Sequence, residues 1–98
     1  MATFISLVSW TDQGVRGYRD TTERAAAFGA ALERLGGNLI SIYWTVGPYD
    51  LVITVEAPDD ETATAALLQI SAVGNVRTVS MRAFSAEEMD AIVTKAAG

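Results

Sequence analysis

Two β-like runs of this sequence, residues 38–46 and 49–57, are separated only by Gly47 and Pro48. Both runs are rich in apolar, β-branched and aromatic side chains, and their apolar and polar residues alternate in a pattern that predicts strands. A two-residue connection is long enough only for a tight hairpin, so the two strands are expected to pair antiparallel. The rest of the chain must then be arranged around that hairpin.

The segments on either side of the hairpin are predicted to add two strands and three helices. Asp20 and Glu23 have the spacing of a capping box before the first helix, and Ser85 and Glu88 have the same spacing before the last. Glycines follow both long helices, as expected of C-terminal caps. The predicted order is a strand at 3–10, a loop at 11–20, a helix from 20 or 21 to 36, strands at 38–46 and 49–57, a helix from 58 to 74, a strand at 75–84 and a short helix from 85.

This β-α-β-β-α-β order predicts an α+β fold of the ferredoxin-like type. Right-handed crossovers place four strands in one antiparallel sheet, in the order 4-1-3-2, with the two long helices on one face. A short C-terminal helix follows the last strand. A chain of 98 residues is the size of one small domain, so a single domain over 1–98 is expected.

The sheet face without helices is expected to be an interface. Half of the residues are hydrophobic, which is more than a small core can bury, and self-association would cover the surplus. Strand parity predicts a helix-facing set of Ile5, Leu7, Leu51, Ile53, Val55, Val79 and Met81. The predicted open-side set is Phe4, Ser6, Val8, Trp10, Ser41, Tyr43, Thr45, Asp50, Val52, Thr54, Glu56, Thr78, Ser80 and Arg82. This mixed set indicates paired sheets that enclose a cavity.

Composition argues against several classes of function. The net charge is −5, and the few basic residues form no patch suited to nucleic acid. Cysteine and histidine are absent, which removes thiolate metal sites, Ser-His-Asp catalysis and the usual general base. The acidic run at 59–61 is explained by helix capping rather than by cation binding. No signal peptide or membrane span is recognised, so a cytoplasmic protein with no metal, cofactor or membrane partner is expected.

The candidate site lies where the first and second strands end and the third begins. Antiparallel topology is expected to bring aromatic and polar side chains together there, next to the 11–20 loop. The ligand-binding candidates are Trp10, Arg16, Tyr43, Trp44, Tyr49 and Asp50. The catalytic candidates are Tyr43, Tyr49, Asp50 and Arg82. For Asp50 the structural alternative is that its carboxylate accepts hydrogen bonds from loop N–H groups or from an arginine.

Three separated motifs give the chain a family resemblance. The run YWTVGPYDLVITVEAPDDE, the later GNVRTVSMRAF and the early WTDQGVRG together resemble the GYD domain family, named for a Gly-x-Tyr-Asp element. Here that element is Gly47-Pro48-Tyr49-Asp50. The resemblance implies a ferredoxin-like fold of the dimeric α/β-barrel type, and it implies no established activity.

Three functions remain open from the sequence, and the third of them, a stress or regulatory partner of another protein, has no residue for or against it. The first is a non-enzymatic homo-oligomeric module that binds a small, partly apolar ligand between its subunits or serves in assembly. The second is a cofactor-independent enzyme of the dimeric α/β-barrel type, resembling small oxygenases that act on aromatic or otherwise electron-rich substrates. There Asp50 or a tyrosine would accept a proton and Arg82 would stabilise an anion.

Overall fold

The computed structural model describes residues 1–98. Its strands are β1 (Ala2–Trp10), β2 (Asn38–Trp44), β3 (Leu51–Ala57) and β4 (Val76–Ala83). Its α-helices are α1 (Asp12–Arg16), α2 (Thr21–Arg34), α3 (Asp60–Val73) and α4 (Ala86–Ala96), and a 3-10 turn covers Tyr18–Asp20. The order of strands and long helices follows the prediction, with one short helix more than expected.

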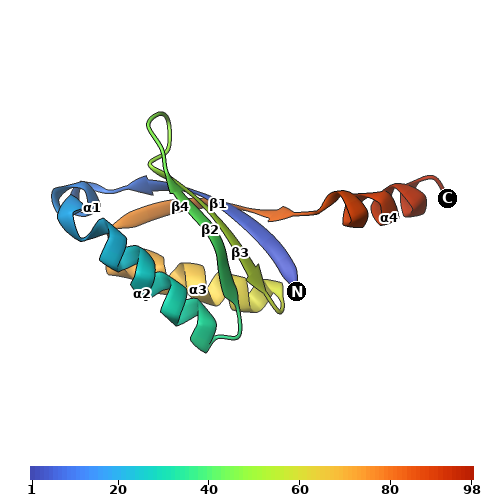
Figure 1. Cartoon of the computed structure of the whole chain (residues 1–98), viewed down its shortest axis with the longest axis horizontal. Coiled ribbons are helices and arrows are strands. Elements are labelled where there is room, and N and C mark those ends of the chain that lie inside the picture. The colour runs from blue at the N-terminus through green and yellow to red at the C-terminus, as the bar shows by residue number, and fades with distance from the viewer.

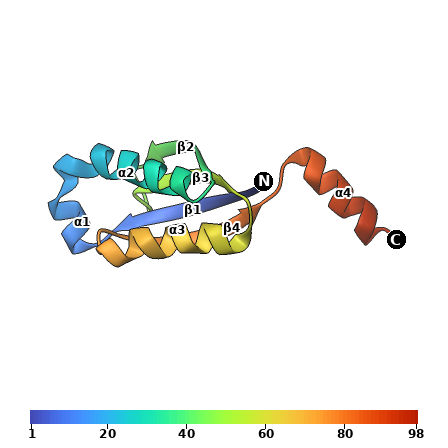
Figure 2. The same cartoon turned by 90° about the horizontal axis from the view of Figure 1, so that it is seen from below.

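The four strands form one antiparallel sheet in the order β2-β3-β1-β4. Read from the other edge, this is 4-1-3-2. Helices α2 and α3 run side by side over one face of the sheet, and the opposite face carries no helix (Figures 1 and 2). The predicted α+β class with a four-stranded antiparallel sheet is confirmed.

The hairpin between β2 and β3 is longer than predicted. Strand β2 ends at Trp44 and β3 begins at Leu51, so residues 45–50 form the connection, which projects from the sheet in Figure 1. The loop is held by Thr45, whose backbone N–H donates to the Asp50 carbonyl and whose hydroxyl donates to the Tyr49 carbonyl. The Gly47–Pro48 bond is trans. Six residues, and not two, connect the strands, so the prediction of a two-residue turn is wrong.

Residues 11–20 are not the loop that was predicted. Thr11 caps α1 by accepting from the Gly14 N–H, and its hydroxyl donates to the Gly74 carbonyl, 2.6 Å away. The 3-10 turn then leads directly into α2, whose N-cap Asp20 makes no capping hydrogen bond. The predicted capping box at Asp20 and Glu23 is therefore wrong. The predicted box at Ser85 and Glu88 is confirmed.

The core lies between the sheet and the helix pair. Its buried members come from β1, α2, β3 and α3: Phe4, Val8, Phe28, Leu32, Leu51, Ile53, Val55, Ala57, Ala63 and Ala66. The register places Phe4 opposite Val55 and Val8 opposite Leu51, so the even-numbered residues of β1 face the helices. The predicted sides of β3 are correct, and those of β1 are reversed.

The reversal of β1 carries over to β4. Ser6 lies opposite Ser80, and the two hydroxyls are hydrogen-bonded at 2.7 Å on the helix side. Arg82 lies opposite Phe4 and is likewise on the helix side. The predicted open face is thus corrected in β1 and β4. What we call the open face carries Ile5, Leu7, Tyr43, Val52, Val79 and Met81, together with the polar Ser41, Thr54 and Glu56 that were predicted there.

Helix α4 extends away from the sheet and from α2 and α3 (Figures 1 and 2). It gives the molecule a longest extent of 52 Å, although the shortest extent is 18 Å. Met89 and Val93, one turn apart, are 48% and 54% exposed. None of the helices combines the length and the apolar character that crossing a bilayer requires.

Candidate functional site

Asp50 is fixed at the end of the β1–β3 ladder. Its Oδ2 accepts a hydrogen bond from the Trp10 N–H at 2.8 Å, and its own N–H donates to the Val8 carbonyl at 2.8 Å. Its carboxylate thus extends the strand pairing to the residue at which β1 ends. The structural alternative for Asp50 is that its carboxylate accepts a hydrogen bond from a backbone N–H of the 11–20 loop or from an arginine. The carboxylate does accept from a backbone N–H, but the donor is Trp10 at the end of β1 and not a residue of the loop.

The aromatic candidates do not converge on one point. Trp44 lies at the end of β2 and donates from Nε1 to the Thr21 hydroxyl at 3.0 Å, which ties β2 to the start of α2. Tyr43, its neighbour, is on the open face. Tyr49 is half-buried in the hairpin connection. Only Trp10 of the aromatic candidates lines a cavity.

Neither Arg16 nor Arg82 is a hydrogen-bond or ion-pair partner of the Asp50 carboxylate. Arg16 is exposed in the last turn of α1. Arg82 is 3.8 Å from the Glu88 carboxylate and stacks over the Phe84 ring at 4.4 Å. Its register position, Phe4, lies six residue steps from Trp10 along β1, a distance of roughly 20 Å. Arg82 and Asp50 therefore cannot contact the same reacting atom in one chain.

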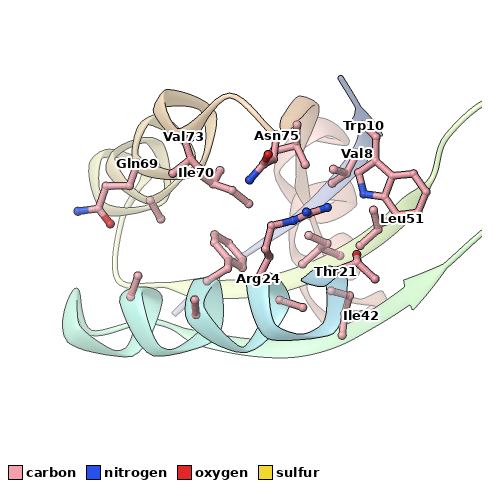
Figure 3. Close-up of a pocket in the computed structure, with 17 residues that line it drawn as sticks. Val8, Trp10, Thr21, Arg24, Ile42, Leu51, Gln69, Ile70, Val73 and Asn75 are labelled. Atoms are coloured by element: carbon pink, nitrogen blue, oxygen red, sulfur yellow. The ribbon is translucent and has the colours of Figure 1, made fainter. Parts of the chain in front are cut away.

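An apolar cavity of about 280 Å³ lies between α2, α3 and the sheet (Figure 3). Apolar side chains supply most of its wall, among them Val8 from β1, Leu51 from β3, Phe28 from α2 and Ile70 from α3. Sequence reasoning looked for a cavity on the opposite face. The available signal was the alanine-rich run of α2, residues 25–31, whose small side chains leave space beside the sheet.

Arg24 places a positive charge at this cavity. Its Nη1 donates to the Gly17 carbonyl at 2.7 Å and its Nη2 to the Gly14 carbonyl at 3.1 Å. No carboxylate lies within ion-pair distance of it, since the ion pair between Arg82 and Glu88 is the only one in the chain. Figure 3 shows the guanidinium reaching into the space between α2 and α3, beside Asn75 and Trp10.

The acidic run at 59–61 begins α3. The Thr62 side chain and the Thr62 N–H, 2.8 Å from Oδ1, hold the pKa of Asp59 below its usual value, as a helix N-cap does. No group of three or more His, Cys, Asp or Glu side chains is close enough to hold a metal ion.

A protein with a functional name is similar to this chain. A protein of Thermus thermophilus, "Glutamine synthetase and cystathionine beta-lyase binding protein", is 35% identical over 90 residues, or 91% of this chain and 95% of that protein. The crystal structure of TTHA0845, also from Thermus thermophilus, is 30% identical with a TM-score of 0.56, covering 88% of this chain and 96% of that one.

A more distant structure, that of MtbAldR, superposes with a TM-score of 0.61 at 16% identity. The superposed region is 86% of this chain and 52% of the MtbAldR chain. At this identity the similarity is evidence for the fold only. The sequence matches the GYD domain family over residues 4–93, as its motifs predicted. Because that match spans nearly the whole chain, the protein belongs to the GYD domain family.

Proposed function

We propose that this protein is a non-enzymatic binding module that pairs with a second copy through its open face and binds other proteins as that assembly. The observation that carries the proposal is the apolar open face. Val79 and Met81 are 51% and 44% exposed there, beside Ile5 and Leu7 on the neighbouring strand. Large apolar patches on small proteins commonly mark interaction sites.

A second copy is the occupant that best suits this face. The patch runs across all four strands, so its natural cover is another sheet of similar width. Two sheets packed face to face bury such side chains in a layer about 10 Å thick. Any space left between them would be bordered by apolar side chains, the Tyr43 ring and the polar Thr54 and Glu56, and would suit a small, partly apolar molecule.

Helix α4 supports the same assembly. A helix of 11 residues is too short to be stable in water without packing. Its apolar side chains Met89, Ile92 and Val93 lie at helical spacing, and the helix extends away from its own subunit (Figure 2). In a pair of copies, α4 would reach the second subunit and pack its apolar stripe there.

The protein-binding part of the proposal draws on the relative. That Thermus protein is named for binding two metabolic enzymes. By analogy, the assembly of this chain would bind a metabolic enzyme of that kind. The enzyme alternative has no comparable support, since Asp50 is engaged by the Trp10 N–H and Arg82 lies at the far end of β1.

Sedimentation velocity of the purified protein tests the pairing. We expect the wild type to sediment as a dimer or a higher even-numbered oligomer, and Val79→Asp to sediment as a monomer, because a charge would be buried between the sheets. Leu68→Asp is the matched control, because Leu68 is 66% exposed on α3 and lies away from the open face. A monomeric wild type, or an unchanged mass for Val79→Asp, would contradict the proposal.

The protein-binding claim needs its own measurement. Biolayer interferometry with purified glutamine synthetase and cystathionine beta-lyase should give saturable binding by the wild type. Binding should weaken for Val79→Asp and persist for Leu68→Asp. Absence of binding to both enzymes would remove the analogy with the relative and leave the assembly claim standing.

A further inference from the structure

The cavity between α2, α3 and the sheet has no function so far. Val8, Leu51 and Ile53 form its floor on the sheet, Phe28 and Ala31 border it on α2, and Ile70 borders it on α3 (Figure 3). It lies on the helix-covered face, opposite the open face. Pairing of two copies through their open faces would therefore leave it accessible.

Small side chains create this space. Ala31 on α2 and Ala66 on α3 border the space, and larger side chains at these positions would extend into it. Protein interiors are close-packed, and an empty apolar space loses the dispersion contacts of its lining. An engineered apolar cavity of about 150 Å³ takes up benzene. A space of about 280 Å³ can hold a larger ring system.

Arg24 gives this apolar space a chemical preference. A guanidinium has five N–H donors, and the carbonyls of Gly14 and Gly17 use two of them. The remaining donors face no carboxylate of the chain. The two carbonyl contacts also hold the side chain in place, so little conformational entropy would be lost when an anion binds. Arginine and a carboxylate can form a two-point, charge-assisted hydrogen bond.

We propose that this cavity binds a small amphiphilic carboxylate. Its apolar body, a substituted or fused aromatic ring, lies among Val8, Leu51, Phe28 and Ile70, and its carboxylate pairs with Arg24. Asn75 lines the same cavity and can donate a further hydrogen bond from its amide (Figure 3). Each chain holds one such site, whether or not it pairs with a second copy.

Isothermal titration calorimetry with 2-naphthoate tests this site, with 2-naphthalenemethanol as the neutral analogue. We expect one naphthoate per chain, bound about tenfold more tightly than the alcohol, since hydrogen bonds to a charged group are the stronger ones. Trp10 lines the cavity, so its fluorescence should change on binding. No binding of naphthoate, or equal affinity for acid and alcohol, would overturn the proposal.

Variants locate the site. Arg24→Gln should weaken naphthoate binding about tenfold and change binding of the alcohol by less than about twofold, because Gln keeps a donor for the loop carbonyls but no charge. Arg34→Gln, on the exposed side of the same helix, is the matched control and should bind as the wild type does.

Ala31→Leu fills the cavity from α2 and should abolish binding of both compounds, while circular dichroism shows that the chain remains folded. It keeps the test decisive if Arg24→Gln fails to fold. Unchanged affinity in Ala31→Leu would overturn the proposal, because the ligand would then be bound elsewhere. Sedimentation of the same samples reports the pairing separately, so failure of one proposal does not imply failure of the other.

Discussion

Gly14 joins α1 to the start of β4 through a close approach of two backbones. A Cβ at this position would overlap the carbonyl oxygen of Asn75, which also accepts a hydrogen bond from the Thr11 N–H at 3.0 Å. The Gly14 carbonyl in turn accepts from Arg24. The absence of a side chain at Gly14 therefore lets the chain approach Asn75, and the carbonyls of Gly14 and Gly17 then hold the Arg24 guanidinium at the cavity.

Gly14→Ala should destabilise the fold by about 2 kcal/mol or more, because backbone atoms must move to accept the methyl group. Urea unfolding followed by circular dichroism measures this. Gly29→Ala is the control: its Cβ would lie 3.4 Å from the Leu39 side chain, an ordinary contact, in the middle of α2. It should be neutral or stabilise by up to about 1 kcal/mol through helix propensity. Equal losses in both variants would contradict this account.

The side chain of Asp50 stabilises the end of β1 through one hydrogen bond. Asp50→Ala leaves the Trp10 N–H without its partner and should cost about 1–3 kcal/mol of unfolding free energy. Asp50→Asn keeps an oxygen acceptor of the same size and should cost clearly less. Thermal and urea unfolding of the two variants gives the comparison. If Asn is as harmful as Ala, the charge of the carboxylate, and not the hydrogen bond, is what the fold requires.

At the scale of single elements, the sequence predicts where a strand lies more reliably than it predicts which of the strand's side chains face the helices. In β3 the run LVITVEA alternates cleanly, and its buried residues are the predicted ones. In β1 the large apolar residues stand at positions 4, 5, 7, 8 and 10, so both faces are apolar and alternation cannot choose between them. The register with β3, which depends on tertiary contacts, makes the choice.

The cavity could not be predicted for a related reason. Its volume depends on how far α2 and α3 stand apart, and the alanine run of α2 is compatible with close packing as well as with a space. Arg24 lies in the first two turns of α2, as the sequence indicates. Its position at the cavity depends on the short helix α1, which sequence reasoning treated as loop.

Glu88 makes the start of α4 sensitive to pH. The Ser85 N–H, 2.9 Å from Oε1, and then the Ser85 side chain hold the pKa of Glu88 below its usual 4.5, with a smaller contribution from the charge of Arg82. Because the folded-state pKa is the lower one, the stabilisation is fully present above about pH 4.5 and is lost as pH falls through the folded-state pKa.

An NMR titration of the Glu88 carboxyl carbon should therefore give a midpoint below the usual glutamate value. Ser85→Ala should raise that midpoint, since the first turn of α4 then frays. Glu88→Gln should make the Ser85 amide signal insensitive to pH in this range. A wild-type midpoint at or above the usual value would mean that the capping box is not formed in solution.

At the scale of the whole molecule, the chain divides into a packed body and an extended helix. Every buried core residue lies between Phe4 and Ala66, and the partly buried residues that pack against the core end at Val76. Helix α4 contributes to neither set. The body therefore contains what the fold needs, and α4 is available for contacts outside its own subunit.

Removal of α4 should separate folding from assembly. A chain ending at Phe84 loses no core residue, so its unfolding free energy as a monomer should stay close to that of the full chain. Its self-association should be weaker, because the apolar stripe of Met89, Ile92 and Val93 no longer packs on the second copy. Sedimentation over a concentration series, with urea unfolding at low concentration, measures both quantities.

The double variant Met89→Ser, Val93→Ser keeps the chain length and should also weaken association. If truncation leaves association unchanged, α4 takes no part in the pairing; if it unfolds the monomer, α4 packs on its own body in solution.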